Sequence, residues 1–174
     1  GRCRLWRCTP DGDDGRFEAL TDHGWVQGFD VRGDALVTLA DGHSHPARVH
    51  LHRPGQAPRR LERFNDAALA GLSLGEVREQ WITGAEGHAV QAWVTLPPDF
   101  NARRRHPVLQ VIHGGPHAAA GDTWSWRWNA HALAAQGHVV VQVNYHGSSG
   151  CGHAFRHAIM GRLGALELQD LEAA

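Results

Sequence analysis

The chain has 174 residues, of which 42% are hydrophobic and 20% charged, and its formal net charge is −1 at pH 7. This composition is typical of a globular protein, and the charge gives no reason to expect a nucleic acid or an anionic membrane as a partner. The three cysteines are scattered and form no CxxC pair. Such cysteine usage favours a reducing compartment, so we expect a cytoplasmic location. No apolar run approaches transmembrane length.

Residues 1–75 read as short strands separated by turns. Arg4–Asp22 contains a strand, a Pro-Asp-Gly turn and a second strand, and Arg48–Asp66 repeats that order around a Pro-Gly turn. Between them, Gly28–Gly42 predicts another pair of strands. A period of about 40–45 residues with several short strands is typical of β-propeller blades. A plain β-meander is the alternative, because two copies cannot close a propeller.

From Glu76 the pattern changes, beginning with a predicted antiparallel hairpin. Val77–Thr83 and Ala89–Pro97 alternate apolar and polar residues on either side of the turn Gly84–His88. We therefore place a domain boundary between residues 75 and 76. At the other end of the chain, Leu166–Ala174 predicts the first turns of a helix.

Two continuous apolar runs follow the hairpin. Val108–Ile112 and His138–Asn144 have the pattern of buried parallel strands, and Trp126–Gly137 between them contains helix-forming residues and ends at a glycine. A strand–helix–strand order after a hairpin indicates an α/β fold. We expect a mixed, mostly parallel sheet with flanking helices.

The segment Ile112–His117, IHGGPH, leaves the first of these strands through two glycines and a proline. It lacks the spacing of a P-loop or a dinucleotide fingerprint, and the chain contains no lysine. Gly114 and Gly115 leave backbone N–H groups uncovered by side chains. In α/β-hydrolases the loop after the third strand supplies an oxyanion-hole donor and has this form. We therefore predict Gly114 and Gly115 as oxyanion-hole donors, with a simple strand-to-helix turn as the alternative.

The chain contains 14 histidines, which raises the question of a metal site. His50 and His52 alternate within a predicted strand, so their side chains share one face and resemble two zinc ligands. The spacing specifies no third or fourth ligand, and the ordinary interpretation is a pair of exposed histidines. We predict no metal and no cofactor.

The HGGP loop, together with the later NY-x-GSSG-x-G segment at Asn144–Gly152, resembles the start of the catalytic domain of the prolyl oligopeptidase family, in its acylaminoacyl-peptidase and dipeptidyl-aminopeptidase-like branch. The resemblance covers most of Glu76–Ala174 and, less closely, the first 75 residues. It implies a serine peptidase in which a β-propeller precedes an α/β-hydrolase domain. Residues 1–75 would then be the last blades, and residues 76–174 the N-terminal part of the peptidase domain. The resemblance implies two partners, peptide substrates and the missing C-terminal half of that domain. A homo-oligomer of the protein is a further option.

The chain departs from the family pattern in the loop after the second apolar run. His146 stands where the family has an arginine and Cys151 where it has a tyrosine, which leaves the substrate preference open. We regard His113, His117, Tyr145 and His146 as pocket-lining candidates rather than as the general base. These four residues lie within or next to the two motifs that carry the resemblance.

No convincing nucleophile is found in the chain. Ser73 is central in GLSLG, but no buried strand precedes it, no helix follows it, and it comes before the HGGP loop. Ser148 has His146 instead of a glycine two residues before it, and Ser149 has Cys151 instead of a glycine two residues after it, so neither is central in a G-x-S-x-G motif. The resemblance implies that the serine, aspartate and histidine of the triad lie beyond Ala174, so that this chain alone would be inactive. An esterase or lipase on the same fold, or a non-catalytic relative, is the alternative.

Three further features carry structural expectations. Asp170 and Glu172 are interpreted as first-turn acids favoured by the helix dipole. The strand Val108–Ile112 would present an open apolar edge, so we expect the chain alone to be poorly soluble or to dimerise. The tryptophans of Thr123–Trp128 are expected to pack in a core, with lining of a gorge between domains as the alternative.

Overall fold

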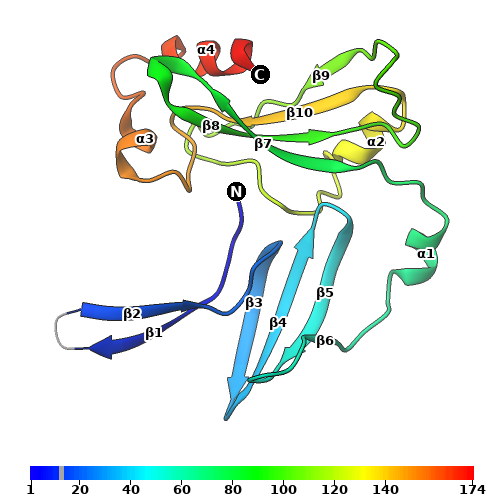
Figure 1. The fold of residues 1–174 in the computed structure, drawn as a ribbon, viewed down its shortest axis with the longest axis vertical. Coiled ribbons are helices and arrows are strands. Elements are labelled where there is room, and N and C mark those ends of the chain that lie inside the picture. The colour runs from blue at the N-terminus through cyan, green and yellow to red at the C-terminus, as the bar shows by residue number, and fades with distance from the viewer. Residues whose placement is uncertain (12–13) are drawn as a thin grey trace. The chain divides into compact units, whose positions relative to one another are not determined.

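A computed structural model of the chain describes residues 1–11 and 14–174, which form two compact units (Figure 1). The N-terminal unit comprises Arg2–Leu72 and Gly121–Ser125, and the C-terminal unit comprises Gly1, Ser73–Ala120 and Trp126–Ala174. None of the helices in the described residues is both long and apolar enough to span a lipid bilayer.

The N-terminal unit contains two antiparallel sheets. Strands β1 (Trp6–Asp11) and β2 (Asp14–Ala19) form a two-stranded sheet whose side chains are exposed on both faces. The second sheet is a four-stranded meander of β3 (Trp25–Arg32), β4 (Ala35–Gly42), β5 (His45–His52) and β6 (Arg59–Arg60) in chain order. Helix α1 (Asp66–Ala70) follows this sheet.

The predicted Pro-Asp-Gly turn of the first stretch is partly wrong. Pro10 and Asp11 belong to strand β1, where they pair with Gly15 and Asp14 of β2, and Gly12 lies outside the described residues. A proline is tolerated there because a two-stranded sheet consists of edge strands only, on which a missing N–H removes no interior hydrogen bond.

A short segment from late in the chain completes the N-terminal unit. The Asp122 carboxylate accepts hydrogen bonds from the backbone N–H groups of Gly24, at 2.9 Å, and His43, at 3.1 Å. The Thr123 hydroxyl donates to the Asp41 carboxylate at 2.9 Å. Two consecutive side chains therefore satisfy polar groups just before β3, in the β4–β5 turn and in strand β4.

The C-terminal unit contains a four-stranded mixed sheet with the order β7–β8–β10–β9. Its strands are β7 (Val77–Thr83), β8 (Ala89–Thr95), β9 (Val108–Gln110) and β10 (Val139–Asn144). The predicted β7–β8 hairpin is confirmed, its turn contains the 3-10 helix η1 (Ala85–Gly87), and β9 and β10 run parallel as expected. The expectation of a mostly parallel sheet is wrong for the described residues, because β8 pairs antiparallel with β10 as well as with β7.

Strand β10 lies in the core of this unit. Val141 and Val143 pack on one face of the sheet with residues of β8, and Phe155 of α3 (His153–His157) and Leu171 of α4 (Ala165–Ala173) cover them. Val140 points to the other face and packs against α2 (Ala130–Ala134). Coverage on both faces explains why this run is apolar at consecutive positions rather than alternating.

Strand β9 is the exposed edge of the sheet rather than a buried strand. It has three residues, and Val108 and Ile112 are 66% and 57% exposed. The strand is shorter than the predicted Val108–Ile112 and is not buried, but its free outer edge in the described sheet agrees with the open apolar edge expected of it. An apolar run by itself cannot distinguish a central strand from an edge strand, because only pairing decides which strand has neighbours on both sides.

Helix α2 is shorter than predicted. Asn129 caps it by accepting a hydrogen bond from the His131 N–H at 2.9 Å, so the helix begins at Ala130 and not at Trp126. Trp126 and Trp128, in the segment before the cap, are 78% and 62% exposed. The expectation that these two tryptophans pack in a core is wrong.

Candidate active-site loops

The loops that follow β9 and β10 lie side by side, because the carboxyl ends of neighbouring parallel strands share one edge of the sheet. Nε2 of His113 and Oγ of Ser148 are 2.8 Å apart, and Nδ1 of His117 is 2.8 Å from the Gly147 carbonyl oxygen. The Ser149 hydroxyl donates to the His117 carbonyl. Side chains and backbone of residues 147–149 therefore hold the HGGP loop at both of its ends.

Tyr145 supports the beginning of the HGGP loop. Its ring stacks on the His113 imidazole with 4.3 Å between centroids, and its hydroxyl donates to the His113 carbonyl. Burial lowers the pKa of His113, so its imidazole is neutral at neutral pH. Burial, assisted by the charge of Glu167, raises the pKa of Tyr145, which therefore remains a phenol that can donate. Neither group brings a charge to this loop at neutral pH.

Gly114 and Gly115 present backbone donors to solvent. Both glycines are exposed, and no described residue accepts a hydrogen bond from either N–H group. Gly115 has φ = 123°, and a Cβ there would lie 2.9 Å from the Ala118 nitrogen, so glycine is required on both conformational and steric grounds. The peptide bond between Gly115 and Pro116 is cis. The arrangement can donate hydrogen bonds to a developing negative charge.

His146 points away from the HGGP loop, toward the hairpin and α4. Its Nδ1 lies 2.7 Å from Oδ2 of Asp170, which also accepts the His146 backbone N–H at 2.6 Å. The other carboxylate oxygen accepts the Ala85 N–H at 2.7 Å. His146 and Asp170 are both fully buried. Asp170 lies within α4 rather than in its first turn, so its interpretation as a dipole-favoured acid is wrong; Glu172 is exposed.

His88 extends this pair. Its Nδ1 lies 2.9 Å from Nε2 of His146, and the His146 ring also stacks on Phe155 with 4.3 Å between centroids. Sequence reasoning missed both His88 and the role of Asp170. The contacts join residues 58 and 24 positions apart, and no local spacing links them.

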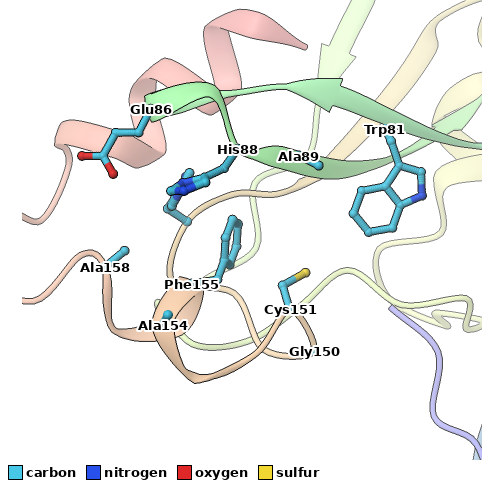
Figure 2. Close-up of a pocket in the computed structure, with 10 residues that line it drawn as sticks. Trp81, Glu86, His88, Ala89, Gly150, Cys151, Ala154, Phe155 and Ala158 are labelled. Carbon is cyan, nitrogen blue, oxygen red and sulfur yellow. The ribbon is translucent and has the colours of Figure 1, made fainter.

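A cavity of about 630 Å³ opens beside this group (Figure 2). It is lined by Trp81, Glu86, His88, Ala89, His146, Gly150, Cys151, Ala154, Phe155 and Ala158. Of the four predicted pocket-lining residues, only His146 lines it. His113, His117 and Tyr145 instead hold the HGGP loop.

The remaining sequence candidates lie apart from these loops. Ser73 is exposed in an irregular segment before β7. His50 and His52 lie in β5 with ring centroids 6.4 Å apart, and His52 contacts the Thr38 hydroxyl at 2.9 Å. Among residues 1–11 and 14–174, no three histidine, cysteine or acidic side chains are arranged to hold a metal ion.

Comparisons with known proteins agree with the resemblance seen in the sequence. The model of the prolyl oligopeptidase family matches residues 124–174. Dipeptidyl-peptidase 5 of Trichophyton equinum is 32% identical over 173 residues, which are 97% of this chain and 24% of that protein. Dipeptidyl-peptidase 5 of Porphyromonas gingivalis is 32% identical over 145 residues, 82% of this chain and 21% of that protein.

Solved structures match over nearly the whole chain. An acylaminoacyl peptidase in complex with Z-Gly-Gly-Phe-chloromethyl ketone matches 99% of it with a TM-score of 0.83 at 25% identity, which is 26% of that protein. Dipeptidyl peptidase 4 of Porphyromonas gingivalis matches 94% with a TM-score of 0.73 at 26% identity, 24% of its own length. The chain thus spans about a quarter of the proteins it matches. These matches support its assignment to the prolyl oligopeptidase family.

Proposed function

We propose that the full-length protein is a serine peptidase that hydrolyses short peptides through an acyl-enzyme. In this proposal residues 1–75 are the last blades of a β-propeller, and residues 76–174 are the N-terminal part of an α/β-hydrolase domain. The observation that carries the proposal is the pair of uncommitted N–H groups at Gly114 and Gly115, at the carboxyl end of a parallel strand. The four-stranded antiparallel meander β3–β6 supports the blade assignment, because one blade has that form.

In the acylation step, a serine from the rest of the protein attacks the scissile carbonyl carbon. The carbonyl π electrons move to the oxygen, which becomes an alkoxide, and the serine proton passes to a base. The N–H of Gly114 or Gly115, with one further donor, would stabilise that alkoxide. Each such donor is worth roughly 3–4 kcal/mol in the transition state. The contacts of His113, His117 and Tyr145 would hold the donors in position before substrate arrives.

The substrates are inferred from the names of the relatives. Matches to dipeptidyl-peptidases and to an acylaminoacyl peptidase support substrates cleaved near the peptide N-terminus. We propose that the 174-residue chain alone is inactive, because no described serine has a histidine and an acid arranged as a triad.

The first test is covalent labelling and turnover of the full-length protein in the cytoplasmic fraction where we expect it. A fluorophosphonate probe should label one serine, and that labelling should abolish hydrolysis of dipeptidyl or acetyl-aminoacyl p-nitroanilides. Labelling with hydrolysis of p-nitrophenyl esters alone would favour the esterase. Neither labelling nor turnover would favour a non-catalytic relative.

The donor role predicts the effect of Gly115→Ala in the full-length protein. The new Cβ would displace the backbone near Ala118, so we expect kcat to fall about 100- to 1,000-fold with a smaller change in KM. Gly137→Ala is the matched control. Gly137 also has a positive φ, 93°, but lies before β10, at the opposite end of that strand from the loop. Equal losses of kcat in Gly115→Ala and Gly137→Ala would contradict the donor assignment.

A further inference from the structure

Three side chains form a hydrogen-bonded chain that runs from the core to the cavity. Asp170, as a carboxylate, can only accept hydrogen bonds, so Nδ1 of His146 carries the proton that joins them at 2.7 Å. With one proton on each imidazole, His146 offers Nε2 as an acceptor, and Nδ1–H of His88 donates to it at 2.9 Å. In this protonation state the buried carboxylate selects the tautomer of both imidazoles.

The consequence appears at the cavity. With its proton on Nδ1, His88 has an unprotonated Nε2, and no described residue donates a hydrogen bond to that atom. His88 is exposed and lines the cavity beside Phe155 (Figure 2). The chain of hydrogen bonds therefore ends in one free acceptor at the wall of the cavity.

The other polar side chains of the cavity are occupied or turned away. Glu86 forms an ion pair with Arg162 at 2.7 Å, and its carboxylate points away from Phe155 in Figure 2. The Trp81 indole nitrogen also points away from Phe155 in that view. Burial raises the pKa of Cys151, so its side chain remains a neutral thiol.

The rest of the lining is apolar. Trp81 and Phe155 contribute aromatic rings, and the remaining lining residues are small: Ala89, Gly150, Ala154 and Ala158. A cavity of about 630 Å³ is within the range of small-molecule sites. A ligand that fits this lining needs an aromatic or apolar frame and a single hydrogen-bond donor.

We propose that this cavity is a binding site for a phenolic ring whose hydroxyl donates to Nε2 of His88. The ring lies between Trp81 and Phe155, and the chain through His146 to Asp170 keeps the acceptor in the correct tautomer. The site does not depend on the peptidase mechanism, since it uses neither Gly114 nor Gly115. Two sources carry this chemistry, a free small phenol and the tyrosyl side chain of a peptide.

The test compares two probes of nearly the same shape, 4-cresol and toluene, by titration calorimetry on the full-length protein. Both should bind, with dissociation constants of roughly millimolar order for ligands of this size. The hydroxyl should make 4-cresol bind about 2- to 10-fold more tightly, which is the usual value of one hydrogen bond. Equal affinities, or no binding of 4-cresol, would overturn the proposal, and this comparison requires no variant.

His88→Phe keeps a ring but removes the acceptor. It should lower the affinity for 4-cresol to that for toluene and leave the affinity for toluene unchanged. His23→Phe, at an exposed histidine of the N-terminal unit, is the control and should change neither. If 4-cresol keeps its advantage in His88→Phe, the acceptor is not His88 and the assignment is wrong.

A third probe, N-acetyltyrosine amide, separates the two sources. Binding at least as tight as that of 4-cresol identifies a peptide side chain as the natural occupant. Binding of 4-cresol without binding of the amide identifies a free small phenol.

Discussion

At the scale of single residues, one glycine allows the hairpin turn to approach α4. The Asp170 carboxylate lies against Gly84 and accepts the N–H of the following Ala85 at 2.7 Å. A Cβ on Gly84 would lie 2.3 Å from Oδ1 of Asp170 and 2.6 Å from Cγ2 of Val90. The missing side chain is therefore a condition for the buried hydrogen bonds of Asp170.

Gly84→Ala should destabilise the C-terminal unit by about 1–3 kcal/mol, because neither the carboxylate nor Val90 can move without losing contacts. Gly71→Ala is the control: nothing lies within 4 Å of its added Cβ, and its φ of −88° suits any residue. That variant should stay within about 0.5 kcal/mol of the parent protein. If urea denaturation shows equal losses of unfolding free energy in Gly84→Ala and Gly71→Ala, the close approach at Gly84 is not the cause.

Partly buried histidines make the folding stability depend on pH. Burial lowers the pKa of His45, His50, His52 and His113 below the ordinary value of 6.5. The unfolded chain then binds protons more readily than the folded one as the pH falls through that value. Folding stability should therefore decrease from pH about 7.5 to about 5. Thermal melting across this range is the measurement, and a melting temperature that rises toward pH 5 would contradict it.

At the scale of secondary-structure elements, the position of a strand in the sheet decides its exposure. β10 has neighbours on both sides and apolar cover on both faces, and Val140 and Val143 are 0% and 1% exposed. β9 has the same apolar composition but only one neighbour in the described sheet. Its outer edge leaves backbone N–H and C=O groups available for pairing with another chain.

The open edge of β9 predicts self-association of the 174-residue chain. Val108→Lys should shift the chain toward monomer in sedimentation velocity, because a charged residue opposes edge-to-edge pairing. Leu168→Lys removes a similarly exposed apolar side chain, 55% exposed, from α4 and should leave self-association unchanged. A monodisperse parent chain would contradict the prediction outright.

At the scale of the whole molecule, the order of the chain does not coincide with the division into units. Residues 121–125 follow the HGGP loop in sequence but belong to the N-terminal unit. Asp122 accepts two backbone hydrogen bonds there, from the N–H groups of Gly24 and His43. A boundary drawn only between residues 75 and 76 separates this segment from the unit that it completes.

Asp122→Ala should therefore weaken the N-terminal unit. Loss of the carboxylate leaves two N–H groups without their acceptor, at a cost of about 1–3 kcal/mol. Hydrogen exchange should accelerate at the amides of Gly24 and His43. Asp99→Ala, at an exposed aspartate of the C-terminal unit, is the control and should leave both amides unchanged. If hydrogen exchange at these two amides is unchanged in Asp122→Ala, the segment does not stabilise the N-terminal unit.

Most features that depend on neighbouring residues were predicted correctly from the sequence, and features that depend on contacts between distant residues were not. The β7–β8 hairpin and the β10 strand were predictable because alternation and apolar runs are local patterns. The start of α2 was not, since the capping bond of Asn129 overrides the helix-forming composition of the residues before it. The exposure of Trp126 and Trp128 was also missed, because burial depends on neighbours that a local pattern does not specify.

The sequence by itself determined the family, through the HGGP loop and the NY-x-GSSG-x-G segment, and it located the candidate donors at Gly114 and Gly115. Only the tertiary structure decided what holds those donors and what surrounds His146. Asp170 and His88 come from α4 and the hairpin, and their contacts with His146 arise when the helix packs on the sheet. The conformation of a turn depends on residues that are adjacent in sequence. A hydrogen-bonded chain across three elements forms only after packing has brought its donor and acceptor atoms within about 3 Å of each other.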